Sequence, residues 1–231
     1  MITIEHLKKQ YKTETVLDIP RLEIPQGQCF GLVGNNGAGK TTLFQIILDM
    51  IRPSIGRVLI NNRDVRETDE WKKYTGSYLD EHFLVDFLTP NEYFMFLARV
   101  YNLSHDDVKA HLDTFKDLFN DEILNKDKYI RDLSKGNLKK VGIAAAMLAF
   151  PDIIILDEPY ENLDPSSQIK FSKKVQEVKE SRNATFLISS HDLKHVTDIC
   201  ERVVLLEKGK IIKDIEGVED SLATLEEYFS G

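Results

Sequence analysis

The sequence predicts an α/β fold with an antiparallel β-subdomain at its N-terminus and a helical subdomain inserted into the α/β core. Three observations predict it. Strand-like runs follow one another closely at the start of the chain, with no helix between them. From Phe30 onward, strand-like and helical segments alternate, which favours a mostly parallel sheet. The stretch from about 83 to 150 interrupts this alternation, because it contains successive helical segments and no apolar strand.

The strand-like runs before the first helix are short and alternate in hydrophobicity. They cover residues 2–4, 16–19, 22–24 and 29–33, and a helix is expected over 42–50. In the helical insertion, Thr89-Pro90-Asn91-Glu92 has the pattern of a capping box with proline in the first turn, and Ser104 followed by Asp107 indicates a second helix start. After Phe150 the α/β pattern resumes. It gives an apolar run over 153–156, a helix from about Pro165, a strand over 185–188, a short helix and a strand over 203–206.

Length and charge narrow the classes of protein. The chain has 231 residues, of which 42% are hydrophobic and 29% charged, enough to bury a core, and we expect one domain over residues 1–231 with the helical subdomain inserted at about 83–150. With 30 basic and 38 acidic residues the formal net charge is −8. An acidic surface does not attract nucleic acid phosphates over long range, so no nucleic acid partner is expected.

Cysteine content and hydropathy predict the cellular compartment in which the chain works. Cys29 and Cys200 are too few for a disulfide framework and lack metal-site spacing, so both are expected to be small buried apolar groups in a reducing compartment. The N-terminus has no apolar signal-peptide segment. The longest apolar stretch, 141–150, has about half of the roughly 20 residues that a membrane helix needs. The chain is therefore predicted to be cytoplasmic and not to span a membrane itself.

The most specific motif is a phosphate-binding loop. Gly34-Asn35-Asn36-Gly37-Ala38-Gly39-Lys40-Thr41 matches G-x-x-x-x-G-K-[ST], follows an apolar strand and opens a helix. Glycines let backbone N–H groups turn toward anionic oxygens, and the helix N-terminus adds positive partial charge. The predicted nucleotide-binding residues are Asn36, Gly37, Ala38, Gly39, Lys40, Thr41 and Thr42. This predicts a P-loop NTPase (RecA-like) core that binds a nucleotide.

Polar groups follow two further apolar strands. Asp157 and Glu158 end the run over 153–156, and His191 follows the strand over 185–188. An acidic pair at a strand end is often a solvated turn, and a lone histidine there is often a capping residue. Ligands of open α/β sheets bind at the carboxyl ends of strands, however, so these groups are expected beside the phosphate loop. There Thr41 and Asp157 suit Mg²⁺, Glu158 suits polarising the attacking water, and His191 suits sensing the γ-phosphate.

With these motifs the chain resembles the nucleotide-binding domain of an ATP-binding-cassette (ABC) transporter. The most specific element is Leu133-Ser134-Lys135-Gly136-Asn137, which resembles the LSGGQ signature of that family, with lysine and asparagine in place of the consensus glycine and glutamine. The resemblance implies that Ser134, Lys135 and Gly136 bind the γ-phosphate of an ATP held by a second subunit. A hydroxyl and a glycine amide at a helix N-terminus suit such an anion.

The resemblance implies roles for three further residues. Tyr11 lies where the family places an aromatic side chain that stacks on adenine, although it could instead be plain packing. Glu81, in Tyr78-Leu79-Asp80-Glu81, replaces the usual glutamine of the Q-loop, and its carboxylate could ligate Mg²⁺. Asp164, in Asn162-Leu163-Asp164, resembles the D-loop that crosses the dimer interface.

The implied function is ATP hydrolysis coupled to transport. The resemblance implies ATP and Mg²⁺ as cofactors and a head-to-tail dimer of cassettes, which is expected to be a homodimer. It also implies a separate transmembrane permease as partner, with this chain bound at the cytoplasmic face of the cell membrane. Phe83, Phe87, Tyr93, Phe94 and Phe96 lie where the family accepts a helix of that permease, although such aromatic residues are more often core. The combination of YLDE, LSKGN and Ser-Ser-His looks most like small exporters, and no further domain is expected after 225–229. The alternative is a soluble ABC-type ATPase in iron–sulfur assembly, DNA repair or translation.

Overall fold

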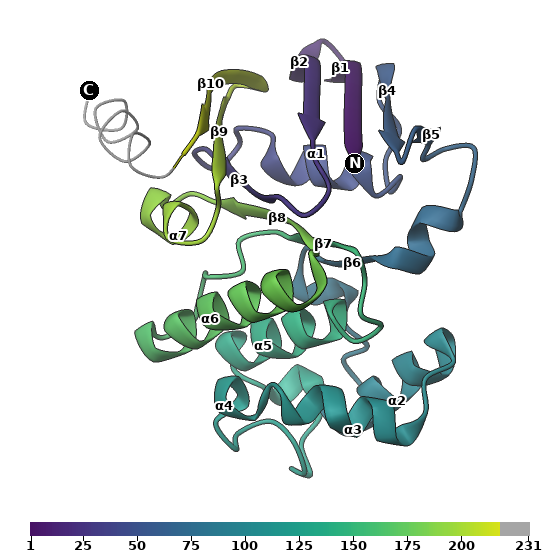
Figure 1. Ribbon diagram of the computed structural model, residues 1–231, viewed down its shortest axis with the longest axis vertical. Helices are drawn as coiled ribbons and strands as arrows, with labels where there is room; N and C mark the ends of the chain where they lie inside the picture. The colour runs from purple at the N-terminus through teal and green to yellow at the C-terminus, as the bar shows by residue number, and fades with distance from the viewer. Residues whose placement is uncertain (218–231) are drawn as a thin grey trace.

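The computed structural model describes residues 1–217 as stacked layers (Figure 1). The strands are β1 Ile2–Tyr11, β2 Glu14–Ile24, β3 Cys29–Val33, β4 Ile55–Ile60, β5 Arg63–Asp64, β6 Thr75–Tyr78, β7 Ile153–Leu156, β8 Thr185–Ser190, β9 Arg202–Glu207 and β10 Lys210–Glu216. The helices are α1 Lys40–Ile47, α2 Pro90–Tyr101, α3 His105–Asp113, α4 Lys116–Phe119, α5 Lys135–Ala146, α6 Pro165–Arg182 and α7 Leu193–Thr197, with short 3₁₀ turns η1 Glu70–Tyr74, η2 Glu81–Phe83 and η3 Ile130–Asp132.

The strands form two sheets of different character. The smaller sheet has the order β2-β1-β4-β5 and its neighbours are antiparallel. The larger sheet has the order β10-β9-β3-β8-β7-β6, in which only the β10–β9 pair is antiparallel. The predicted α/β fold with an N-terminal antiparallel β-subdomain is confirmed. The return of β4 and β5 to the first sheet, after helix α1, was not predicted.

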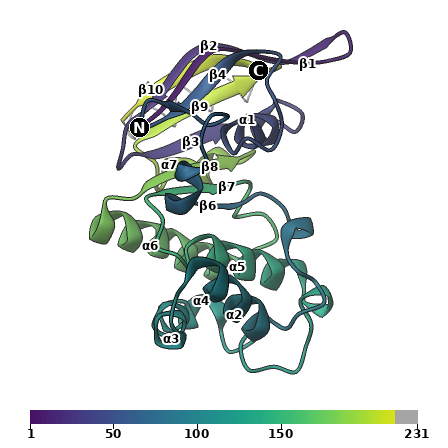
Figure 2. The ribbon, with the colours of Figure 1, turned by 90° about the vertical axis from the view of Figure 1, so that its right-hand side faces the viewer.

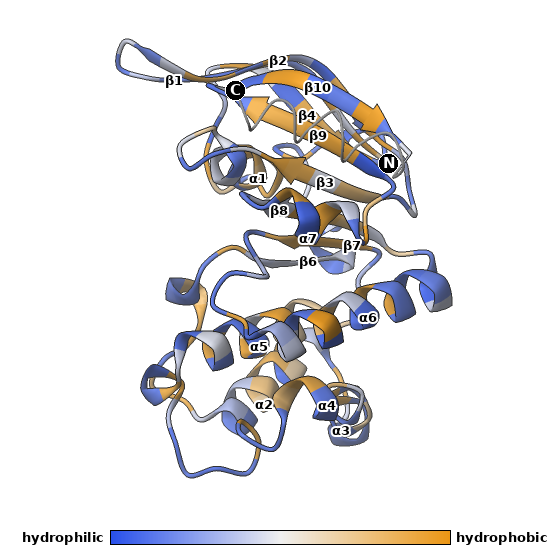
Figure 3. Ribbon diagram, turned by 90° about the vertical axis from the view of Figure 1, so that its left-hand side faces the viewer, coloured by the Kyte–Doolittle hydropathy of each residue, from blue (hydrophilic) through white to orange (hydrophobic). Residues whose placement is uncertain are grey.

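The central strands are buried on both faces because each contributes side chains to two cores. Along β7, Ile153 and Ile155 pack with α1 and the antiparallel sheet, whereas Ile154 and Leu156 pack with the helices on the other side. This explains the continuous apolar runs, because strands of a parallel sheet are covered on both sides. Strands β3 and β9 are hydrophobic along most of their length in Figure 3.

The helices on the other side of the large sheet form two tiers. Helices α5 and α6 lie next to the sheet, and α2, α3 and α4 lie beyond them, farthest from the antiparallel sheet (Figures 1 and 2). Gly142 allows α5 to approach β6 closely, since a Cβ there would lie 2.1 Å from ring atoms of Tyr78. The predicted capping boxes are both present: Thr89 with Glu92 begins α2, and Ser104 with Asp107 begins α3.

Three further expectations concern the cysteines, the start of helix α1 and membrane spans. Cys29 and Cys200 are buried as predicted, and their Sγ atoms lie 3.1 Å apart. Helix α1 begins at Lys40, not Thr42, because Gly39 takes a left-handed conformation (φ 108°) that lets the helix start directly after it. Within residues 1–217, no helix combines the length and the hydropathy needed to cross a membrane. The segment 225–229 lies outside the described residues.

Candidate functional site

The phosphate loop joins the end of β3 to the start of α1 and is shaped by two glycines. Gly37 (φ 83°) and Gly39 (φ 108°) both lie in the left-handed region, which favours glycine. A Cβ on Gly39 would lie 2.9 Å from the carbonyl oxygen of Val16, whereas the space beside Gly37 is open. The loop residues 36–42 line a cavity of about 190 Å³ together with Val16 and Glu158. The contribution of Val16 carries no sequence signal, because it is one apolar residue of a strand.

Lys40 is folded back over the loop. Its side chain is 6% exposed, and Nζ donates a hydrogen bond to the carbonyl oxygen of Gly34 at 2.5 Å. The same Nζ lies 3.1 Å from Oε1 of Glu158, whose side chain is 18% exposed. The structure therefore brings together the lysine of the loop and the acidic residue that follows β7, which the sequence only placed at the same sheet edge.

Asp157 is held by two hydroxyl groups. The Thr41 hydroxyl donates to Oδ2, and the Ser189 hydroxyl donates to Oδ1. Burial raises the pKa of Asp157, whereas the two hydroxyl donors and nearby Lys40 act in the opposite direction. Ser189 was missed as a site residue. The signal was present, because Ser189 precedes His191 at the end of the same apolar strand.

Glu158 is positioned from four directions. His191 contacts Oε2 of Glu158 through Nδ1 at 2.9 Å and through its backbone N–H at 3.2 Å. The backbone N–H of Glu158 donates to the Ser189 hydroxyl at 2.8 Å, and its carbonyl oxygen accepts from Lys139 Nζ at 3.0 Å. With Lys40 on Oε1, the carboxylate and its peptide are both fixed. The carboxylate thus lies at the edge of the loop cavity, where it can accept a proton.

The residues fit a nucleotide phosphate and Mg²⁺. The cavity offers open space beside Gly37, backbone N–H groups at the start of α1 and one buried ammonium group, which together suit phosphate oxygens. The Thr41 hydroxyl and the Asp157 carboxylate meet at one point, and both are oxygen donors of the type Mg²⁺ uses. No group of three acidic, histidine or cysteine side chains forms a metal site among residues 1–217.

Other predicted residues lie apart from this cluster. Tyr11 ends β1, is 49% exposed, and its ring lies 4.6 Å from Lys9 Nζ. Glu81 begins η2, after β6 and the residues Leu79 and Asp80, and within residues 1–217 no hydrogen bond or ion pair joins it to Thr41 or Asp157. Asp164 caps helix α6, accepting from the hydroxyl of Ser167 at 2.5 Å and from its backbone N–H at 3.0 Å, and these hydrogen bonds lower the pKa of Asp164.

The signature-like residues form the exposed start of α5. Ser134 is the N-cap, and its hydroxyl accepts from the N–H of Asn137 at 3.3 Å. Gly136 packs against the segment before α6, since a Cβ there would lie 2.8 Å from the carbonyl oxygen of Asn162. Within residues 1–217, no hydrogen bond, ion pair or shared cavity joins residues 134–136 to the phosphate loop. The two groups of residues predicted to bind phosphate are therefore separate within one chain.

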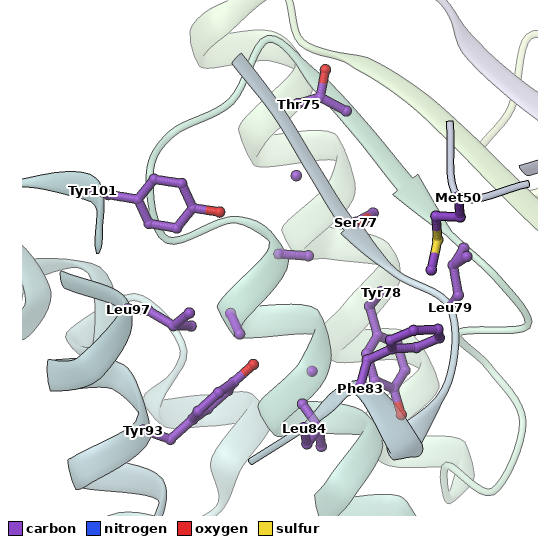
Figure 4. Close-up of a pocket in the computed structure, with 14 residues that line it drawn as sticks. Met50, Thr75, Ser77, Tyr78, Leu79, Phe83, Leu84, Tyr93, Leu97 and Tyr101 are labelled. Carbon is purple, nitrogen blue, oxygen red and sulfur yellow. The ribbon is translucent and has the colours of Figure 1, made fainter. Parts of the chain in front are cut away.

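A second cavity lies between the large sheet and the helical tier. It has a volume of about 200 Å³ and is lined mainly by β6, the segment 79–84, α2 and α5 (Figure 4). Tyr93, Leu97 and Tyr101 extend from α2 on one side, and Tyr78 and Phe83 lie on the other (Figure 4). Phe83 is 54% exposed, so the cavity has an aromatic side chain at its accessible edge.

Comparison with known proteins defines the class. The profile of the family described as ABC transporter matches residues 17–161. The solved structure "Dimeric Structure of MJ0796, a Bacterial ABC Transporter Cassette" superposes with a TM-score of 0.83 at 25% identity, covering 94% of this chain and 98% of that one. The chain therefore belongs to the ABC transporter family, as an ATP-binding ATPase cassette.

Relatives in the same family include proteins of both resistance and import. The "Uncharacterized ABC transporter ATP-binding protein YhaQ" of Bacillus subtilis is 34% identical over 91% of this chain and 69% of its own length. The linearmycin resistance ATP-binding protein LnrL of the same species is 29% identical over 92% of this chain and 68% of its own. The methionine import ATP-binding protein MetN of Carboxydothermus hydrogenoformans is 28% identical over 93% of this chain and 66% of its own. The chain thus spans about two thirds of these relatives.

Proposed function

We propose that this chain is the ATP-hydrolysing subunit of an ABC exporter, and that two copies enclose two ATP molecules head-to-tail. The observation that carries the proposal is the convergence of Lys40, Asp157, Glu158 and His191 at one sheet edge, beside a cavity formed by the phosphate loop. Glu158 contacts both Lys40 and His191, and Asp157 contacts Thr41 of the loop, so the site holds a cation for phosphate, a carboxylate for the metal and a carboxylate for the attacking water, which suits phosphoryl transfer to water.

In this proposal the side chains of the site have distinct roles. Lys40 and the loop N–H groups bind the phosphates, and Tyr11 stacks on the adenine. Thr41, Asp157 and Glu81 would hold Mg²⁺, which when bound neutralises charge on the phosphate oxygens. Glu158 polarises the attacking water, and His191, in contact with Oε2 of Glu158, orients that carboxylate and senses the γ-phosphate. Because Lys40 pairs with Glu158 in the structure, binding of phosphate would draw the ammonium away and release Oε1.

The separation of the two predicted phosphate-binding groups supports a head-to-tail dimer. Ser134, Lys135 and Gly136 lie at the exposed N-terminus of a helix of 12 residues, where N–H groups and the helix dipole favour an anion. Since they do not reach the phosphate loop of their own chain, we assign them to the γ-phosphate of the partner copy. Asp164, which caps α6 beside Gly136, would then lie at the interface between two identical subunits.

The membrane partner is assigned to the second cavity. An accessible cavity lined by Tyr93, Leu97, Tyr101 and Phe83 suits a short apolar helix. We therefore place the chain at the cytoplasmic face of the cell membrane, bound to a separate transmembrane permease.

Export rather than import is the finer part of the proposal. Its support is the combination of YLDE, LSKGN and Ser-Ser-His, together with similarity to the resistance protein LnrL. The import protein MetN has nearly the same identity to this chain, so the direction must be measured. Transport assayed in inverted and right-side-out vesicles, with the chain and its permease, distinguishes the two directions.

The decisive test uses Glu158→Gln. This variant keeps the shape of the side chain and its contact with His191 but removes the proton acceptor. ATP should therefore bind, hydrolysis should fall at least about 100-fold, and the ATP-bound protein should elute from size-exclusion chromatography as a dimer.

Two variants serve as controls. Asp152→Asn removes an exposed carboxylate beside the opposite end of β7 and should behave as the unmodified protein. Lys40→Ala should lose nucleotide binding. Rapid turnover by Glu158→Gln would remove Glu158 from the proposed role, and normal turnover by Lys40→Ala would overturn the assignment of the phosphate loop.

A further inference from the structure

Lys139 is a buried lysine that touches the proposed site from a different element. It lies on α5, five residues after the N-cap Ser134, and is 8% exposed. Its Nζ donates to the carbonyl oxygen of Glu158 at 3.0 Å and lies 5.4 Å from the centre of the Tyr78 ring. The lysine therefore joins the helix that carries the signature-like residues to the peptide of the acidic residue after β7.

The backbone at Glu158 needs such support. Its φ is 46°, in the left-handed region, which is unfavourable for a residue with a long side chain. Three hydrogen bonds hold its backbone: the N–H donates to Ser189, and the carbonyl oxygen accepts from Lys139 at 3.0 Å and from the backbone N–H of Glu161 at 3.2 Å. The Ser189 bond comes from β8 and the Lys139 bond from α5, so the orientation of Glu158 depends on both elements.

The choice of a charged side chain at this position is also informative. Burial lowers the pKa of Lys139, and the carboxylates of Glu161, Asp157, Glu158 and Asp80 act in the opposite direction. A buried ammonium group carries a desolvation cost that an apolar residue would avoid. Lys139 offsets that cost through the Glu158 carbonyl, the Tyr78 ring and the nearby carboxylates, which include Asp157 and Glu158 of the proposed site.

We infer that Lys139 is a positioning residue that holds the Glu158 peptide in its left-handed conformation, so that the proton-accepting carboxylate is aligned through helix α5. The inference rests on the proposed role of Glu158. It adds a physical connection between two proposed sites. A shift of the α5 N-terminus on contact with the partner's nucleotide would reach Glu158 of the same chain through Lys139.

The test compares Lys139→Met with Lys139→Gln. Methionine keeps the length and removes the donor, whereas glutamine keeps a donor. Single-turnover hydrolysis is measured, because its rate constant does not depend on the fraction of protein that is folded. For Lys139→Met the rate constant should fall about 10- to 100-fold, as expected when a reacting group is misplaced. The ATP Kd should be unchanged, ATP should still produce the dimer, and Lys139→Gln should recover much of the rate.

A matched control is available in Lys174→Met. Lys174 also lies 5.4 Å from an aromatic ring, that of Phe115, but it pairs with Glu177 on α6 and is not in the site. It should keep the original rate constant. A Lys139→Met variant with the original rate, or one whose rate falls only together with its ATP affinity, would overturn the inference.

The Glu158→Gln background separates the inference from the proposed function. There, Lys139→Met should cause no further loss over a single turnover followed for hours, because the group that Lys139 aligns is already disabled. A further loss would show that Lys139 acts elsewhere. If Glu158→Gln alone hydrolyses ATP rapidly, the proposed role of Glu158 fails. If Glu158→Gln is slow and Lys139→Met is fast, only the positioning role of Lys139 fails.

Discussion

Ser189 illustrates how much one small side chain determines at the residue scale. Its hydroxyl donates to Oδ1 of Asp157 and accepts from the backbone N–H of Glu158 at 2.8 Å, and its side chain is completely buried. Because a hydroxyl both donates and accepts, one atom fixes the spacing of two consecutive acidic residues. An amino acid without a hydroxyl at this position would leave a buried carboxylate oxygen and a buried N–H group short of a partner.

Ser189→Ala is therefore expected to affect both stability and turnover. The variant should lose about 1–3 kcal/mol of unfolding free energy, the typical cost of an unsatisfied buried polar group, and its ATPase rate should fall about 10-fold. Urea unfolding and steady-state hydrolysis measure the two effects. Thr185→Val is the control. Thr185 lies on β8 like Ser189 but at the other end of the strand, far from Asp157, and its hydroxyl accepts from the backbone N–H of Gly27. Equal ATPase loss in both variants would show that the effect is only general destabilisation.

At the same scale, the sequence predicted the site residues that directly follow strands of the large sheet. It did not predict Lys139, which reaches the site from helix α5. Asp157, Glu158 and His191 were placed near Lys40 because ligand sites of α/β sheets lie at the carboxyl ends of strands. The contact of Lys139 with the Glu158 carbonyl depends on how closely α5 packs on β6, which depends on Gly142 and Tyr78 together. No local pattern in the sequence specifies that distance.

Among the elements, α3 is joined to α5 by a buried histidine. Nε2 of His111 donates to the carbonyl oxygen of Ala144 at 2.9 Å, and its ring lies 4.9 Å from Phe115 and 5.8 Å from Phe150. Burial is the largest cause that lowers the pKa of His111, to about 4, and Lys174 and Arg182 act in the same direction. The folded protein therefore holds this side chain neutral at physiological pH.

This predicts an acid sensitivity of the helical tier. In the unfolded chain His111 takes up a proton below its ordinary pKa of about 6.5, whereas in the folded chain it does so only near 4. Its contribution to stability is thus present above pH 6.5 and is lost as the pH falls toward 4, by about 3 kcal/mol in total. Urea unfolding at several pH values should show that His111→Gln, which keeps a donor but does not titrate, lacks this part of the loss. Identical pH profiles would contradict the assignment.

The starts of helices could be predicted from neighbouring residues, whereas the pairing of distant strands could not. The starts of α2 and α3 were predicted because a capping box is written in four consecutive residues, Thr89 to Glu92 and Ser104 to Asp107. The pairing of β4 with β1 was not, since it joins Ile2 to Ile60 across helix α1. Such pairing depends on burying the inner face of the antiparallel sheet, which no single segment encodes.

On the scale of the whole molecule, the cavity of Figure 4 and the phosphate-loop cavity have no lining residue in common. The first is aromatic and lies between β6 and the helical tier, and the second is polar and lies at the strand ends of the large sheet. Helix α5 connects them, since Gly142 and Ala145 line the first cavity and Lys139 contacts Glu158. Binding of a permease and binding of a nucleotide can therefore be tested separately.

Phe83→Ser is predicted to separate the two activities. Loss of an aromatic side chain at the cavity edge should reduce the amount of protein that sediments with membranes containing the permease, while ATP hydrolysis by the isolated chain stays unchanged. Phe96→Ser is the matched control, because Phe96 is similarly exposed (46%, against 54% for Phe83) but does not line the cavity. Equal membrane binding by the two variants would place the permease contact elsewhere.

The distance between the signature-like residues and the phosphate loop also has a genetic consequence. Under the proposed arrangement, every catalytic centre draws on two polypeptides, so a copy that lacks a working Ser134 damages its partner's centre and not its own. A copy that lacks Lys40 damages the centre formed by its own phosphate loop. Co-expressed with the normal chain, either allele should leave one intact centre in each mixed pair, and the two alleles together should also leave one, because both defects then fall in the same centre.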